Sequence, residues 1–208
     1  MQFLKWLLWM FVIAFVGIVM VGFMLPRDIA VTRSMDIGVP VERVFAEINR
    51  PAASKDWVPW GTLDADTVFS FSGPEEGYDA RMKWENPKFR DYGRGLQTIV
   101  VSERNRRVVS ELNLEKMGDA RADFELAELG TGTRVTATFA TNLGHSPFGR
   151  WLGLLLDDWL TEDLDSALGK LKTKLETAPV PVEVRPLSDG AQTPAAEQPA
   201  MPGTAPAQ

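Results

Sequence analysis

The segment from Ser146 to Glu176 constrains the fold most, because it reads as one long helix with a broad apolar face. Ser146 can accept hydrogen bonds from the free backbone N–H groups at its start, and Pro147 fits the first helical position. The apolar residues recur mostly at steps of three and four: Phe148, Trp151 or Leu152, Leu155, Trp159, Leu164, Ala167 or Leu168, Leu171 and Leu175. A helix with so wide an apolar face needs a large partner, so the preceding chain is expected to wrap around it.

Residues 29–145 are predicted to supply that partner as a sheet. Ile29–Ile37 alternates as a strand does, and a short helix follows with Val41, Val44 and Ile48 on one side. Pro51 stops this helix before the aromatic turn at residues 55–61.

Six more short strands are predicted from Asp66 onward, separated by Gly-containing turns. Within each strand the residues expected to share a face are Phe69 and Phe71; Tyr78, Ala80, Met82 and Trp84; Val108, Ser110, Leu112 and Leu114; Ala120, Ala122, Phe124 and Leu126; Val135, Ala137 and Phe139. The remaining strand, Gly93–Ser102, is apolar and β-branched around Thr98–Val101. Short connections favour antiparallel pairing, and one polar face per strand predicts a sheet covered on one side only. The predicted fold class is therefore α+β, with a seven-stranded antiparallel sheet wrapped around the long C-terminal helix.

Residues 1–28 are predicted to be a transmembrane anchor. Trp6 to Leu25 is a run of 20 uncharged residues, about 30 Å as a helix and thus long enough to cross a bilayer. A cleaved signal peptide would have a shorter apolar core followed by small residues. The prediction is a single-pass anchor in the cell membrane at residues 6–25. The short N-terminal tail with Lys5 favours an inside N-terminus, which places the domain on the exported (periplasmic or extracellular) side.

The amino-acid composition disfavours several classes of function. The net charge of −6 disfavours nucleic acid as a partner, because its binding depends on Lys and Arg neutralising phosphates. The chain has no Cys and one His, so we expect neither a metal site nor thiolate chemistry, and no cofactor. Residues 179–208 are rich in Pro and Ala and are predicted to be a disordered tail after a folded domain at residues 29–178.

The order of these elements resembles the helix-grip fold of the START-like superfamily, and more closely its polyketide cyclase/dehydrase-like branch, often labelled SRPBCC. The resemblance covers about Ile29 to Glu176. Its motifs are Ile37-Gly38-Val39-Pro40-Val41-Glu42-Arg43-Val44-Phe45, Trp57-x-Pro59-Trp60, Trp84 with Gly93-Arg94-Gly95, Gly132-Thr133-Arg134-Val135-Thr136, and Asp163-Leu164-Asp165-Ser166-Ala167-Leu168 with Leu171-Lys172 and Glu176.

This resemblance implies an apolar cavity between sheet and helix that holds lipids, polyketides, quinones or similar ligands. Two positions depart from the pattern of the branch. Ala137 stands where an aromatic residue often follows the Val-Thr pair, and Ala167 stands where a Gly is usual. The first departure is expected to change what the cavity holds.

Large aromatic residues beside small ones are the best indication of a cavity in the sequence itself. Inward-facing Ala and Ser residues opposite the helix leave space unless tryptophan side chains fill it, and filling of the core by the tryptophans is the alternative. The predicted ligand-cavity residues are Trp57, Trp60, Arg81, Trp84, Ser110, Ala122, Ala137, Trp151, Leu155 and Trp159.

Catalytic candidates are few. His145 is the one imidazole and a weak candidate for a general base. The acidic residues of the long helix are expected to form a solvated face: Asp157, Asp158, Glu162, Asp163 and Asp165. The predicted function is therefore a membrane-anchored binding protein for a hydrophobic small molecule (lipid, isoprenoid or polyketide-like). The alternatives are a cyclase/dehydratase-type enzyme using His145 with Asp56 or Arg81, which is less favoured, and a non-catalytic envelope interaction protein.

Overall fold

The computed structural model describes residues 2–61, 65–88, 93–115, 118–144 and 146–178, except for the side chains of Leu4, Leu152, Leu154 and Leu155. His145 and the predicted tail at 179–208 lie outside the described residues.

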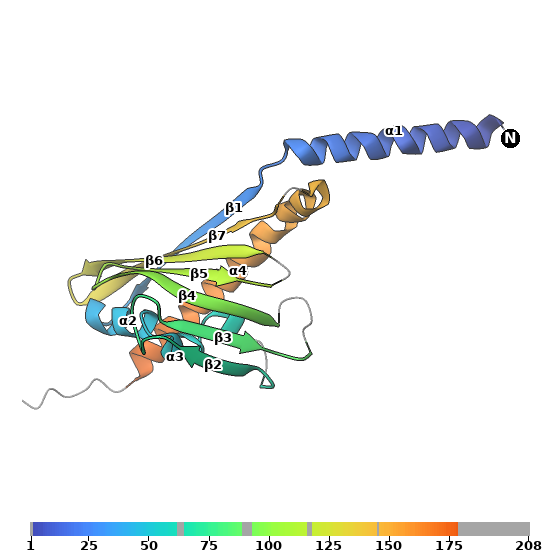
Figure 1. Cartoon of the computed structure of the whole chain (residues 1–208). Helices are drawn as coiled ribbons and strands as arrows, with labels where there is room; N and C mark the ends of the chain where they lie inside the picture. The colour runs from blue at the N-terminus through green and yellow to red at the C-terminus, as the bar shows by residue number, and fades with distance from the viewer. Residues whose placement is uncertain (1, 62–64, 89–92, 116–117, 145, 179–208) are drawn as a thin grey trace, which may run out of the picture. The chain divides into compact units, whose positions relative to one another are not determined.

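Seven strands form one antiparallel sheet, as predicted (Figure 1). The strands lie in the order β1-β7-β6-β5-β4-β3-β2, so only the first strand leaves its place in the sequence to pair with the last. Their bounds are β1 Asp28–Ile37, β2 Val68–Ser72, β3 Arg81–Glu85, β4 Arg94–Glu103, β5 Arg107–Asn113, β6 Asp119–Leu129 and β7 Gly132–Asn142.

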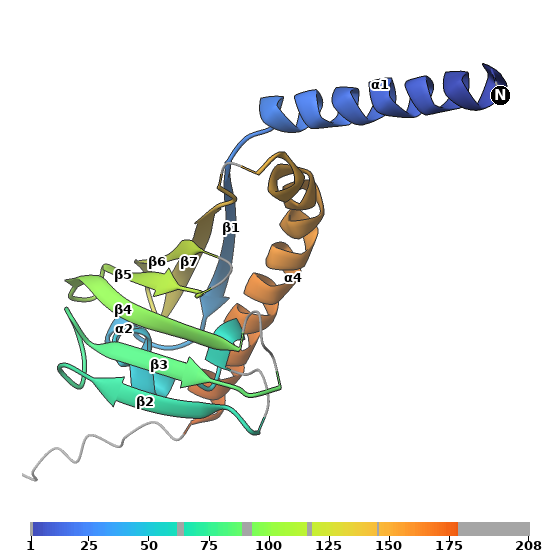
Figure 2. The same cartoon turned by 45° about the vertical axis from the view of Figure 1, so that its right-hand side comes forward.

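One long helix, α4 (Pro147–Thr177), packs against one face of the sheet, which confirms the predicted α+β helix-grip architecture (Figure 2). It begins as predicted: the Ser146 Oγ accepts a hydrogen bond from the Gly149 N–H at 3.5 Å, and Pro147 occupies the first turn. The other helices are α1 Gln2–Met24, α2 Val41–Ile48, α3 Pro51–Ser54 and the 3₁₀ turn η1 Pro59–Gly61.

The core follows the alternation of the strands. Inward residues of the central strands, such as Ile99, Val108 and Val135, are fully buried and belong to one hydrophobic cluster with Leu168 and Leu171 of α4, which are also fully buried. These residues form the hydrophobic core of the domain.

One inward assignment is wrong. Tyr78 is 70% exposed, because β3 begins only at Arg81 and the adjacent Gly77 and Asp79 have positive φ angles of 84° and 64°, which are incompatible with a strand. Phe71 pairs with the buried Met82 and so lies on the inner face as predicted, but it is 48% exposed because β2 is an edge strand that pairs only with β3.

The C-terminal end of α4 is fixed to α2 and α3 by Lys174. Its ammonium group contacts Glu47 at 2.7 Å and Asp56 at 2.9 Å, and donates a hydrogen bond to the Ala53 carbonyl at 2.9 Å. Burial opposes the charge, but the bonds to the two carboxylates outweigh it and raise the pKa of Lys174. This end of the helix therefore closes the fold.

The opposite end of α4 packs against α1. Arg150 is 3% exposed and donates hydrogen bonds to the carbonyls of Phe23 at 2.6 Å and Leu25 at 3.4 Å. These carbonyls belong to the end of α1, where a helix lacks internal donors and favours positive charge. The next residue of α4, Trp151, donates a hydrogen bond from its indole N–H to the Ile18 carbonyl of α1 at 3.0 Å. The first turns of α4 and the last turns of α1 thus form one packed unit.

Cross-linking tests this junction. The rings of Phe15 and Phe148 lie 6.3 Å apart, and the chain has no cysteine. We expect the pair Phe15→Cys and Phe148→Cys to be joined in high yield by a short bis-maleimide in membranes, and Arg150→Leu to lower that yield. The control pair, Phe3→Cys and Phe148→Cys, is about 18 Å further along the helix and should remain unjoined; equal yields for both pairs would contradict the packing.

Candidate functional site

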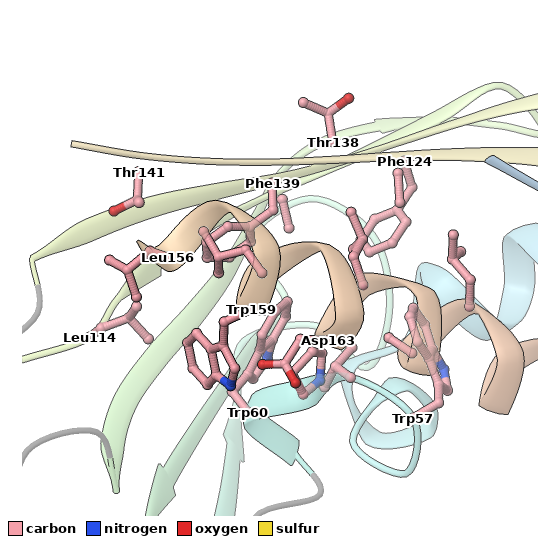
Figure 3. A pocket seen from close by; sticks show the side chains of 18 of the residues that line it. Trp57, Trp60, Leu114, Phe124, Thr138, Phe139, Thr141, Leu156, Trp159 and Asp163 are labelled. Carbon is pink, nitrogen blue, oxygen red and sulfur yellow. The ribbon is translucent and has the colours of Figure 1, made fainter. Parts of the chain in front are cut away.

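A cavity of about 340 Å³ lies between the middle of α4 and the sheet (Figure 3). This volume falls in the range of small-molecule sites. The sheet contributes Ala122, Phe124, Ala137, Thr138, Phe139 and Thr141, with Leu114 and Leu143 from adjoining turns. Helix α4 contributes Leu156, Trp159, Leu160, Asp163, Leu164, Ala167 and Leu168, and the turn around η1 contributes Trp57, Val58, Pro59 and Trp60.

Small residues create this space. Ala137 pairs with Phe124, and Ala122 pairs with Phe139, so each of these two alanines lies beside a phenylalanine of the neighbouring strand. Ala167 is the third small residue, on the helix side. The phenylalanine rings form walls, and the missing side-chain volume at the alanines forms the hollow between them.

Trp60 is held in place by a buried polar chain. Its indole N–H donates to the Gln97 Oε1 at 2.8 Å, and the Gln97 amide donates to the Ser110 Oγ at 3.1 Å. Behind it lies Trp84, whose ring centroid is 6.5 Å away and which fits only because Gly95 has no Cβ, since that atom would fall 2.2 Å from the Trp84 ring. The support fixes the orientation of Trp60 and uses up its one polar atom.

Five predicted cavity residues are lining residues in the structure: Trp57, Trp60, Ala122, Ala137 and Trp159. Ser110 and Trp84 do not line it but support Trp60 from behind. Arg81 points to the outer face of the sheet and pairs with Asp79 at 2.6 Å, because Trp84 of the same strand points inward. Trp151 packs against α1, and the side chain of Leu155 lies outside the described residues.

The predicted catalytic alternatives are not brought together. Asp56 pairs with Lys174, and Arg81 lies on the outer face of the sheet. Among the described lining residues Asp163 alone is ionisable, so that wall positions no acid–base pair.

Asp163 corrects the expectation of a wholly solvated acidic face. Asp157, Asp158, Glu162 and Asp165 are exposed as predicted, but Asp163 is half-buried in the cavity wall. Burial raises the pKa of Asp163; Lys170 opposes this effect and Glu162 adds to it. The sequence held a signal for this placement: Asp163 lies four residues after Trp159 and four before Ala167, on one helix face.

Gln97 was also missed. It is 2% exposed on the inner face of β4, beside Ile99 in the alternation. A polar residue at an inward position of an apolar strand indicates a buried hydrogen-bond network, and that pattern could have identified it.

The cavity reaches the end of the sheet that carries α1. The register pairs Asp28 with Asn142 and Ala120 with Thr141, so the start of β1 and the end of β7 lie at the same end of the strands. The lining residues Thr141, Leu143 and Leu114 lie at this end, and α1 ends four residues before β1 begins. Trp159, 52% exposed, completes the rim.

A family comparison agrees with this architecture. The family described as "Polyketide cyclase / dehydrase and lipid transport" matches residues 28–176, so the chain belongs to that family. No sequence among the curated proteins matches significantly.

Solved structures show the same fold. A protein from Rhodobacter sphaeroides is 14% identical with a TM-score of 0.52, over 72% of this chain and 93% of its own. A protein from Nitrosospira multiformis is 15% identical with a TM-score of 0.51, over 71% of this chain and 96% of its own. At this identity the likeness concerns the fold alone.

The raised pKa of Asp163 has a measurable consequence for stability. A carboxyl group with a raised folded-state pKa contributes stability below its unfolded pKa and loses that contribution as pH rises through the folded pKa. We expect Asp163→Asn to melt roughly 1–3 °C above the parent at pH 7, and the difference to vanish below about pH 4.

Thermal unfolding monitored by circular dichroism between pH 3.5 and 8 measures this difference. Asp158→Asn is the control, since Asp158 is exposed on the same helix, and its melting temperature should track the parent. A lower melting temperature for Asp163→Asn at pH 7 would mean that the folded protein stabilises the charge.

Proposed function

We propose that this chain is a membrane-anchored binding protein for a hydrophobic small molecule of the lipid, isoprenoid or polyketide-like class. The observation that carries the proposal is the cavity, walled by aromatic and aliphatic side chains from α4, β6 and β7. Each Å² of apolar ligand surface removed from water there contributes about 25 cal/mol. The family description, which names lipid transport, supports the same class of ligand.

The ligand is proposed to contact five residues of the wall. Trp57 and Phe124 pack edge to face at 5.6 Å, and Trp60 and Phe139 lie 6.2 Å apart, so these rings form stable flanks. Ala137 and Ala122 provide the floor between them. The proposed contact residues are Trp57, Trp60, Ala122, Ala137 and Trp159.

The proposed anchor explains the position of the cavity. Helix α1 contains 20 residues, Lys5–Met24, that are long and apolar enough to cross a membrane. The lining residues at the sheet edge beside α1 would lie near the bilayer surface, where apolar molecules are concentrated. We propose that α1 stays uncleaved, that the domain lies on the exported side, and that ligand exchanges directly between bilayer and cavity.

Filling the cavity tests the proposed binding. Ala137 is 1% exposed at the floor of the site, and a phenylalanine ring there would occupy space that the ligand needs. We expect Ala137→Phe in the full chain to weaken binding of a neutral fluorescent probe such as N-phenyl-1-naphthylamine at least tenfold, while the far-ultraviolet circular dichroism stays unchanged.

The matched control places the same ring on the outer face. Ala127 is exposed on β6, so Ala127→Phe adds equal hydrophobicity outside the cavity and should bind the probe like the parent. If the parent shows no saturable binding, or if both variants bind equally well, the cavity is not the ligand site.

A further inference from the structure

One carboxylate interrupts an otherwise apolar and aromatic wall. Asp163 projects from α4 into the cavity, and Trp159 lies one turn earlier on the same helix face. In Figure 3 the carboxylate lies next to the indole rings of Trp159 and Trp60. A negatively charged group and the faces of large aromatic rings thus line one space.

Trp60 presents its ring, not a hydrogen-bond donor, to the cavity. The Trp60 N–H is already bound to Gln97 at 2.8 Å, and the ring centroids of Trp84 and Phe139 lie 6.5 and 6.2 Å from that of Trp60. What Trp60 offers to the cavity is therefore the negative face of its π-system.

The protein supplies no partner for Asp163 within the part of the chain that the structure describes. It accepts no hydrogen bond there and forms no ion pair within 4.0 Å, and no Lys, Arg or His is among the described lining residues. Lys170, two turns further along α4, acts on it only at longer range. A half-buried carboxylate with no partner among the described residues is costly, and a cation in the cavity would offset that cost.

We propose that the cavity selects an amphiphile with a cationic nitrogen head group, an alkylamine or alkylammonium compound, whose head lies between Asp163 and the ring faces of Trp159 and Trp60. This inference rests on the proposed function and adds the chemistry of the head group. Carboxylates attract ammonium ions, and tryptophan faces do so by cation–π interaction. Phosphate-bearing zwitterionic lipids fit less well, because the described wall has no basic residue for the phosphate.

Three probes with one chain and different heads test the inference. Dodecylamine, dodecanol and dodecanoate carry a positive, neutral and negative head at neutral pH, and each would compete with the neutral fluorescent probe on the full chain in nanodiscs of uncharged lipid. We expect dodecylamine to bind about tenfold more tightly than dodecanol, and dodecanoate to bind most weakly.

The variant Asp163→Asn keeps the shape of the side chain and removes its charge. In this variant the preference for amine over alcohol should fall to about one, and a far-ultraviolet circular dichroism spectrum like that of the parent reports an intact fold. Asp158→Asn, exposed on the same helix, should keep the full preference.

The possible failures are distinguishable. Equal binding of the three probes to the parent, or an amine preference that survives Asp163→Asn, would overturn the inference and leave the hydrophobic-ligand proposal standing. Failure of all three probes to bind would overturn both.

Discussion

The burial of α4 against the curved inner face of the sheet is the interaction on which the rest of the structure depends. Its C-terminal half is packed tightly: Leu168 and Leu171 are fully buried, and Lys174 ties the helix end to α2 and α3. Because these contacts hold the helix, its middle can stand off from the sheet and leave a cavity. The same helix thus supplies core residues towards its C-terminal end and cavity-wall residues between Leu156 and Leu168.

The cavity lowers the stability of the fold. Cavities lined by apolar groups lose the dispersion contacts that a close-packed core would have, and the half-buried carboxylate of Asp163 adds a desolvation penalty. Both costs are concentrated in one place, between α4 and β6–β7. A site that is unfavourable when empty and favourable when filled is the pattern expected where stability has been traded for binding.

Much of the fold could be predicted from the sequence, because periodicity reports directly on which face of an element is buried. The long helix, its cap at Ser146 and the seven antiparallel strands all follow from local patterns. The site was harder to predict, because a cavity forms only where inward side chains of the helix and the sheet do not contact one another. The alternation of apolar and polar residues correctly predicted that Ala122 and Ala137 face inward. It does not distinguish an inward tryptophan that fills the core, as Trp84 does, from one that lines a cavity.

The errors have specific causes. Trp151 was assigned to the cavity because the apolar face of α4 was expected to meet only the sheet, whereas its first turns meet α1. Asp163 was assigned to solvent with its acidic neighbours, although it alone of them lies in line with Trp159 and Ala167. Tyr78 was placed in a strand because alternation continues through a turn whose positive φ angles the residue types did not reveal.

Native mass spectrometry of the full chain, released from its membrane in mild detergent, tests the central claim most directly. The account predicts a protein peak carrying one apolar small molecule per chain, with the ligand lost at low collision energy and identifiable by its own mass. A chain that always appears at its bare mass, and that takes up no lipid, isoprenoid or polyketide-like compound when supplied in excess, would contradict it.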